Sequence, residues 1–169
     1  MLRIFIMGLI VFLNFVLQTT LFPYVAILGV VPQTSILLIV SYAILRGDVE
    51  GAVLGFCIGF LQDVVFMDYL GLFALLFGLT GFVCGKPFKD FFKDSFMLPV
   101  ILAFFAMIGY EIVFYFIHFM MQGRLVDYFR IIILPGTIYT MLLAIPMYHI
   151  VFFVNKRLER YEKRVRRIF

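Results

Sequence analysis

The chain has 169 residues, of which 64% are hydrophobic and only 14% are charged. Its mean hydropathy is +1.11. Soluble domains carry about 25% charged residues, so the composition excludes an ordinary soluble domain. The apolar runs are continuous rather than alternating, which argues against a membrane β-barrel and predicts an all-α integral membrane bundle.

Six membrane-spanning helices are expected. In chain order they cover about residues 4–22, 31–45, 49–66, 71–85, 97–121 and 131–154. The first run contains Asn14 and Gln18, and no small-residue cleavage site follows it. We therefore interpret it as a retained span and not as a signal peptide.

The third span is organised around a row of glycines. Gly47, Gly51, Gly55 and Gly59 recur every fourth residue, and Asp63 occupies the next step. Such a row forms one ridge on a helix, and without side chains it lets a second helix approach until the backbones touch. Each glycine costs a helix roughly 1 kcal/mol relative to alanine, so close packing has to compensate. The row is interpreted as a packing seam in preference to a ligand groove.

The fourth span carries a matching set of small residues. Gly71, Gly78, Gly81 and Gly85 keep broadly to one face. Spans three and four are therefore predicted to pack glycine face to glycine face. Both are short for a bilayer about 30 Å thick, which local thinning or shielding inside the bundle would accommodate.

The spans contain several polar residues, of which Asn14, Gln18, Asp63 and Glu111 bear on packing and function. Asn14 and Gln18 stand four apart and are expected to bond a neighbouring helix. Asp63 lies about 24 Å along the helix from Gly47, near the outer edge of the hydrocarbon and within reach of water. Glu111 lies near the midplane, so we expect it to face the bundle, protonated or paired, with Tyr115 as a donor.

These residues do not form a catalytic pattern. One aspartate within a span is too few for an intramembrane aspartyl protease, and the sequence has no H-E-x-x-H motif and no phosphate-binding loop. Cys57 and Cys84 sit singly in apolar runs, without metal spacing. We expect no catalytic, metal or cofactor-binding site.

The basic residues predict the orientation. If the C-terminal tail is cytoplasmic, twelve of the fourteen lysines and arginines lie inside and only Arg124 and Arg130 lie outside. An even number of spans with both termini inside satisfies this rule. The net charge of +4 comes almost entirely from the tail and does not indicate nucleic-acid binding.

The chain is divided into a membrane domain, 1–155, and a basic tail, 156–169. Tail residues Leu158, Tyr161, Val165 and Ile168 form an apolar stripe. An interfacial helix held by anionic lipid is favoured, and a docking helix for a cytoplasmic partner is the alternative.

The order of these features resembles the MreD family of bacterial rod shape-determining membrane proteins. The resemblance covers about half of the chain and rests on these features: Gln18, Pro32, Arg46-Gly47, the Gly51/Gly55/Gly59 row, Gln62-Asp63 and Leu70-Gly71. One departure is Gln33, where the family often has aspartate, and this weakens the expectation of a polar role at that position.

The resemblance implies a non-enzymatic scaffold of the cell-elongation machinery in the bacterial inner membrane. The implied partners are the bitopic protein MreC, the actin-like MreB, the polymerase RodA and a class B penicillin-binding protein. The basic tail would meet anionic lipid or MreB. The mechanism predicted on this basis is that spans three and four form a rigid unit beside a groove for the single span of MreC.

The implied fold is similar to that of vitamin-transporter substrate-capture subunits. A capture subunit of this kind is therefore the alternative function, because such subunits are also compact and have six spans. The sequence shows no internal repeat in support of transport.

Overall fold

A computed structural model describes residues 2–26, 31–66, 71–86, 97–122 and 134–166. This part of the chain contains six α-helices and no strand, which confirms the all-α membrane class. The helices are α1 (Leu2–Val16), α2 (Thr34–Arg46), α3 (Asp48–Phe66), α4 (Leu72–Gly85), α5 (Met97–Gln122) and α6 (Leu134–Arg166). The connector 87–96 and the loop 123–133, which were predicted to carry Lys89, Lys93, Arg124 and Arg130 to opposite membrane surfaces, lie outside the described residues.

The first span does not end abruptly. α1 continues through a π-helical turn, η1 (Leu17–Leu21), and a 3-10 turn, η2 (Phe22–Val25). Pro23 lies in the first turn of η2, where its missing N–H is no loss. The helical run therefore extends past Phe22 and changes its hydrogen-bonding pattern on the way.

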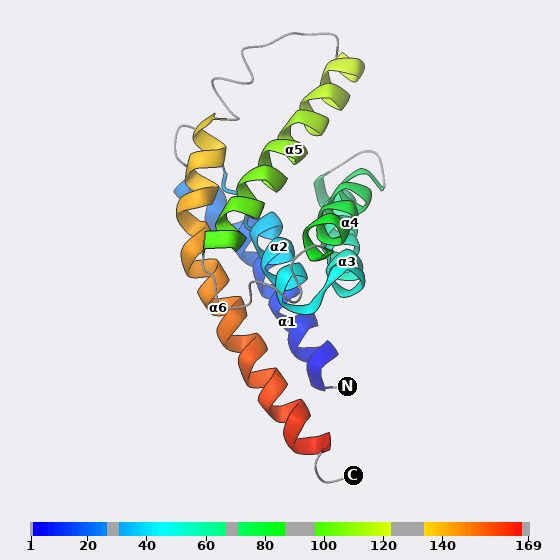
Figure 1. The fold of residues 1–169 in the computed structure, drawn as a ribbon. Coiled ribbons are helices and arrows are strands. Elements are labelled where there is room, and N and C mark those ends of the chain that lie inside the picture. Colours follow the sequence, from blue (N-terminus) through cyan, green and yellow to red (C-terminus); the bar gives the residue numbers. More distant parts are fainter. Residues whose placement is uncertain (1, 27–30, 67–70, 87–96, 123–133, 167–169) are drawn as a thin grey trace.

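Within the part of the chain that the structure describes, four segments are long and apolar enough to cross a membrane. They are Phe5–Val25, Asp48–Phe66, Pro99–Phe116 and Gly136–Leu158. α2 and α4 are apolar but shorter, at 13 and 14 residues. α2 lies at the centre of the bundle, and every residue from Thr34 to Leu45 is buried (Figure 1). Its short length is therefore tolerated because the other helices, and not lipid, surround it.

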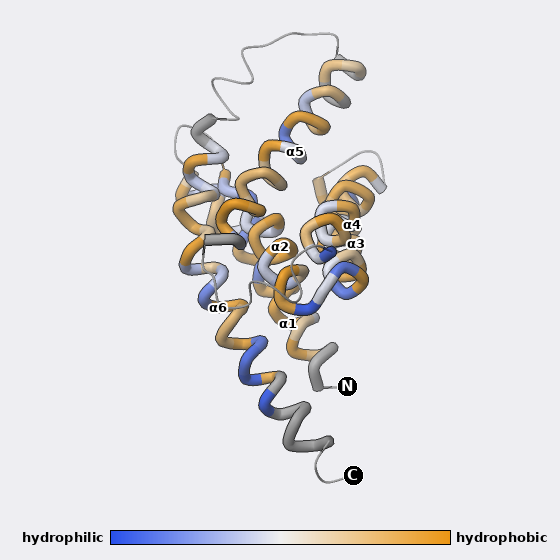
Figure 2. Tube along the Cα trace, viewed as in Figure 1, coloured by the Kyte–Doolittle hydropathy of each residue, from blue (hydrophilic) through white to orange (hydrophobic). Residues whose placement is uncertain are grey.

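Successive helices run in alternating directions. The start of α1 and the end of α6 therefore lie at the same end of the bundle (Figure 1). The ends of α2 and α4 point the same way. We call this the inner end, and the opposite end the outer end. Apolar residues dominate most of the tube, and hydrophilic residues gather at the start of α3 and in the lower part of α6 (Figure 2).

α6 extends past the expected membrane boundary. Its 33 residues span about 50 Å, well beyond a hydrocarbon layer of about 30 Å. The helix runs through Pro146 and through position 155, where the membrane domain was expected to end. Leu158 is only 5% exposed and belongs to the core, so at this position the apolar stripe faces the bundle. The division into a membrane domain and a tail remains a prediction.

Candidate functional site

The closest contact between described helices is a seam of glycines between α3 and α4. A Cβ atom added at Gly55 would overlap the carbonyl group of Phe77, and one added at Gly59 would overlap that of Phe73. A Cβ added at Gly81, on the opposite helix, would overlap the carbonyl group of Gly51. The backbones of the two helices therefore touch, as the spacing predicted.

The seam also reaches neighbouring segments. A Cβ at Gly51 would lie 2.5 Å from the Cβ of Ala43, so α2 packs against the same glycine. A Cβ at Gly85 would lie 2.5 Å from the backbone nitrogen of Asp48, at the start of α3. The seam thus consists of Gly51, Gly55, Gly59, Gly81 and Gly85.

Three glycines of the predicted set have other positions. Gly47 lies outside α3: it ends α2 with a φ of 105° and donates its N–H to Ala43. Gly71 precedes α4 with a φ of 110° and has no atom within 4 Å of an added Cβ. Gly78 meets only ordinary contacts, at 3.6 Å. Spacing alone could not separate these roles, because turn glycines and seam glycines fall on the same row.

Asp63 caps the start of α4 from the end of α3. Its carboxylate accepts hydrogen bonds from the backbone N–H groups of Gly71 at 3.1 Å, Phe73 at 2.9 Å and Ala74 at 2.9 Å. α4 has no capping side chain of its own. The first N–H groups of a helix lack partners within it, and the positive end of its dipole favours an anion. Asp63 therefore supplies acceptors for three backbone N–H groups at the start of α4.

The expectation that Asp63 is hydrated is wrong. Its exposed fraction is 0%. The distance of Asp63 along α3 did not predict its exposure to water, because the start of α4 covers its side chain. The three backbone donors replace water as its hydrogen-bonding partners.

A layer of polar side chains surrounds the start of α2. Asn14 donates to Thr34 at 3.1 Å, and Ser35 donates to Asn14 at 3.1 Å. Gln18, in the π-helical turn, accepts a hydrogen bond from Thr34 and shares the single proton of the Ser35 hydroxyl with Asn14. The predicted bonding of Asn14 and Gln18 to a neighbouring helix is therefore confirmed. The layer, as we use the term, consists of Asn14, Gln18, Gln33, Thr34, Ser35, Gln62, Tyr110 and Thr140.

Gln33 connects this layer to the last two helices. Its side chain donates to the hydroxyl of Tyr110 on α5 at 3.3 Å, and its backbone N–H donates to Thr140 on α6 at 3.2 Å. It also accepts a bond from Gln18. The expectation of a weakened polar role at Gln33 is therefore wrong, since a neutral amide can donate and accept at the same time.

Gln62 connects the layer to the glycine seam. It donates to Ser35 at 2.9 Å and is 2% exposed, immediately before Asp63. The sequence analysis treated Gln62 only as part of a motif. Its interhelical bond could have been predicted, because a buried amide inside an apolar helix needs a hydrogen-bonding partner within the protein.

Tyr110 also belongs to an aromatic stack between α4 and α5. Its ring lies 5.9 Å from that of Phe73, 5.6 Å from that of Phe77 and 5.8 Å from that of Phe114. These centroid distances are typical of favourable aromatic pairs. Glu111, the next residue, is 7% exposed and so faces the bundle as expected. Its protonation state and a bond from Tyr115 remain predictions.

Comparison with protein-family models decides the family. The model of the rod shape-determining protein MreD matches residues 1–157. The chain belongs to the MreD family. The match extends beyond the half of the chain on which the resemblance was based and includes α5 and most of α6. Comparisons with curated proteins and with solved structures gave no match. The likeness to vitamin-transporter subunits therefore remains a prediction.

In this MreD-family chain, the inner end has its own polar contacts. Arg46, the last residue of α2, donates to Asn155 of α6. Tyr42 donates to Glu50 of α3 at 3.1 Å. These bonds join α2 to α3 and α6 at the end opposite the polar layer.

The seam predicts a contrast between two alanine substitutions. Gly55→Ala is expected to lower the free energy of unfolding by about 1–3 kcal/mol, because its methyl group would collide with the backbone of α4. Gly78→Ala is expected to be neutral or to stabilise by up to about 1 kcal/mol, because it has room and gains helix propensity. Unfolding in mixed detergent micelles, followed by circular dichroism, measures both. Equal stability of the two variants would contradict the seam.

The cap predicts a graded series at Asp63. Asp63→Ala is expected to cost about 2–4 kcal/mol, since it leaves buried N–H groups of α4 without acceptors. Asp63→Asn keeps one acceptor oxygen and should lose about half as much. The same unfolding measurement tests the order. An alanine variant as stable as the asparagine variant would show that the carboxylate does not act as the cap.

Tyr110 predicts a separation of two roles. Tyr110→Phe keeps the aromatic stack and removes the acceptor of Gln33, which should cost about 1 kcal/mol. Tyr110→Ala removes both and should cost about 3–5 kcal/mol. If the two variants lose equal stability in unfolding experiments, the stack contributes nothing.

Proposed function

We propose that this MreD-family chain is a non-enzymatic scaffold that holds the single membrane span of MreC against the α3–α4 hairpin. The family supports a role in rod shape determination. The observation that supports this location is the glycine seam, which joins α3 and α4 along their backbones into one rigid unit.

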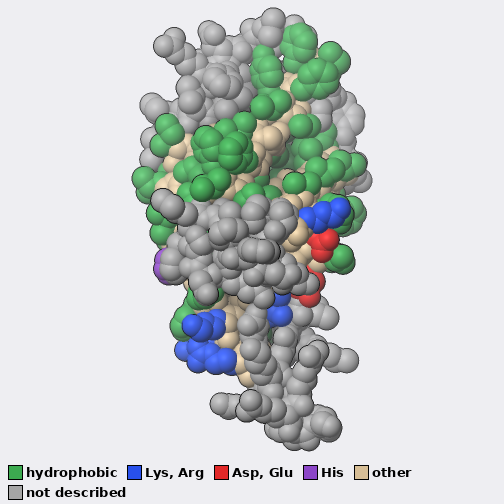
Figure 3. Space-filling model, viewed as in Figure 1, with side chains coloured by type: hydrophobic (Ala, Val, Ile, Leu, Met, Phe, Trp, Pro, Cys, Tyr) green, Lys and Arg blue, Asp and Glu red, His purple; other side chains and the backbone are tan. Residues whose placement is uncertain are grey.

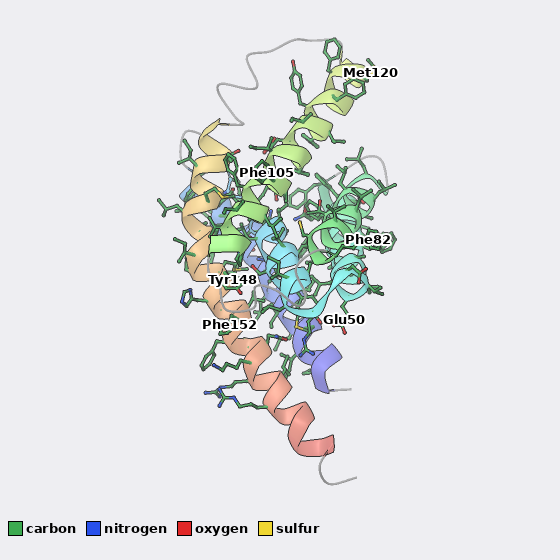
Figure 4. The ribbon with its side chains drawn as sticks, viewed as in Figure 1. Glu50, Phe82, Phe105, Met120, Tyr148 and Phe152 are labelled. Atoms are coloured by element: carbon green, nitrogen blue, oxygen red, sulfur yellow. The ribbon has the colours of Figure 1, made fainter. Side chains whose placement is uncertain are left out.

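The outward face of the hairpin suits a helical partner. On α3, Val53, Phe56 and Phe60 are 60%, 55% and 48% exposed. On α4, Leu75 and Leu79 are 63% and 58% exposed. Phe82 projects from the hairpin away from α2 (Figure 4). These residues define the hairpin face, an apolar surface on a rigid support.

Gly78 provides a low point in the hairpin face. Its added Cβ would lie 3.6 Å from the carbonyl oxygen of Ala52 and from the Cβ of Phe56, so the seam does not require glycine here. A glycine beside two small or flat neighbours lets an incoming helix approach closely. We place the MreC span over Gly78.

The orientation is part of the same proposal. The inner end carries Arg46 at the end of α2, Lys86 just after α4, and Lys156, Arg157 and Arg160 within the last part of α6. The positive-inside rule assigns this end to the cytoplasm, with both termini there and the polar layer toward the periplasm. From this position in the bacterial inner membrane, the scaffold would link MreC to a RodA-like polymerase, a class B penicillin-binding protein and MreB.

A glycine-to-leucine scan tests the docking face. Gly8 on α1, Gly78 on α4 and Gly109 on α5 all leave space for a Cβ atom, so none needs to be glycine for internal packing. Gly78→Leu is expected to reduce co-purification of tagged MreC at least tenfold. The matched controls Gly8→Leu and Gly109→Leu should leave it unchanged. Retention of MreC by all three variants would show that the hairpin face is not the docking site.

Native mass spectrometry separates the scaffold from the alternative. The wild-type protein should carry a single-span protein and no stoichiometric small molecule. A bound vitamin at one per chain would favour the substrate-capture subunit and overturn the proposal.

A further inference from the structure

The lower part of α6 has two distinct faces. Val151, Asn155 and Leu158 are each 5% exposed, and Asn155 accepts a bond from Arg46. This stripe holds α6 against the bundle. Phe153, Lys156, Arg157 and Arg160 lie on the open side of the helix. The side chains of Lys156, Arg157 and Arg160 are therefore directed outward by the packing of the opposite face.

Cation–aromatic pairs place these basic groups at the membrane boundary. The Lys156 ammonium lies 5.6 Å from the ring centroid of Phe152, and the Arg157 guanidinium lies 4.8 Å from that of Phe153. In both pairs the aromatic residue is one turn closer to the membrane centre. Lys86 lies 4.3 Å above Phe82 in the same arrangement at the end of α4. Aromatic rings and long cations gather where hydrocarbon meets headgroups, so the pairs mark that level.

The open face continues toward the outer end as a largely apolar track, in which the exposed His149 stands between Ile145 and Phe153 with its Nδ1 3.2 Å from the Ile145 carbonyl oxygen. Ile138, Leu142 and Ile145 are 65%, 71% and 59% exposed. Their spacing of four and three keeps them on the same side as Phe153 and Lys156. One leaflet of hydrocarbon is about 15 Å thick, which corresponds to about ten residues of helix. From Arg157 this distance reaches the turn that follows Ile145.

We propose that this open face of α6 binds one anionic phospholipid of the inner leaflet. Lys156, Arg157 and Arg160 hold the phosphate of the headgroup, and the acyl chains lie along Phe153 and Ile145. An apolar track that ends in three cations matches an amphiphile with a negative head. An acidic soluble protein would use only the basic end and would leave the track without a role.

The site differs from a tail lying flat on the membrane. α6 is one continuous helix to Arg166, and its apolar residue Leu158 is covered by the bundle. On the face shown in Figure 3, basic side chains gather below the main hydrophobic surface, and others lie at its right-hand edge. Lipid binding here does not depend on the proposed MreC contact, so the two proposals fail separately.

The absence of tryptophan from the chain allows a direct test. Phe153→Trp creates a single fluorescent reporter at the expected headgroup boundary. The full-length variant is reconstituted in phosphatidylcholine vesicles that contain phosphatidylglycerol, with bromine on the acyl chains of one lipid or the other. Brominated phosphatidylglycerol is expected to quench the reporter as if enriched about fivefold over its bulk fraction. Phe105→Trp on α5, where the phenylalanine is 65% exposed and lies farther from the inner end than Phe152 (Figure 4), is a control away from the three cations and should report the bulk fraction.

Neutralising the cations tests their role. In the Phe153→Trp background, the triple variant Lys156→Gln, Arg157→Gln, Arg160→Gln should abolish the preference, and circular dichroism checks that the helix content is kept. Glycerol 3-phosphate at millimolar concentration should not compete, because it lacks acyl chains. Equal quenching by the two brominated lipids overturns the proposal. A preference for phosphatidylglycerol that survives neutralisation of the three cations also overturns it. Loss of a co-purifying acidic protein from such a variant would then assign the cations to a protein contact.

Discussion

The backbone contact between α3 and α4 is the constraint on which the rest of the structure depends. Carbonyl groups of one helix occupy the space where side chains of the other would stand. The two helices can therefore pack this closely only in the register that places glycines against the partner backbone. Asp63 stands four residues beyond Gly59, on the same row, and is delivered to the start of α4 by that contact. Packing and capping therefore support each other: the seam brings the carboxylate to the helix start, and the carboxylate holds that start against the seam.

α2 transmits this constraint to the rest of the bundle. Near the inner end it packs against the seam through Ala43 and Gly51, and near the outer end Ser35 accepts a bond from Gln62. The same short helix bonds α6 at both ends, through Gln33 with Thr140 and through Arg46 with Asn155. α2 is therefore held at both ends by neighbouring helices, and its 13 residues are enough because it does not have to span the bilayer against lipid.

Much of this arrangement could be predicted, because long apolar runs and glycine spacing report directly on helices and close contacts. The six helices lie near the expected ranges, and Gly51, Gly55 and Gly59 form the expected seam. The expectations that proved wrong concern the spatial surroundings of a residue, which its position along the chain does not show. Spacing cannot show that Gly47 and Gly71 adopt positive φ angles at turns, and height along a helix cannot show what covers Asp63. Charge composition likewise marked a tail after residue 155 but could not show that α6 continues through it.

The distribution of polar groups bears on the two function classes. A substrate cavity needs polar groups that stay open to a ligand. Around the start of α2 the amides and hydroxyls bond one another across several helices, and Asp63 accepts three bonds from backbone donors. The outward surfaces of α3 and α4 are instead apolar, and described cations stand at the inner end. In the two proposals made above, recognition within the membrane rests on shape, where Gly78 allows close approach, and recognition at its surface rests on charge. That combination suits a protein that holds helices and lipids in place.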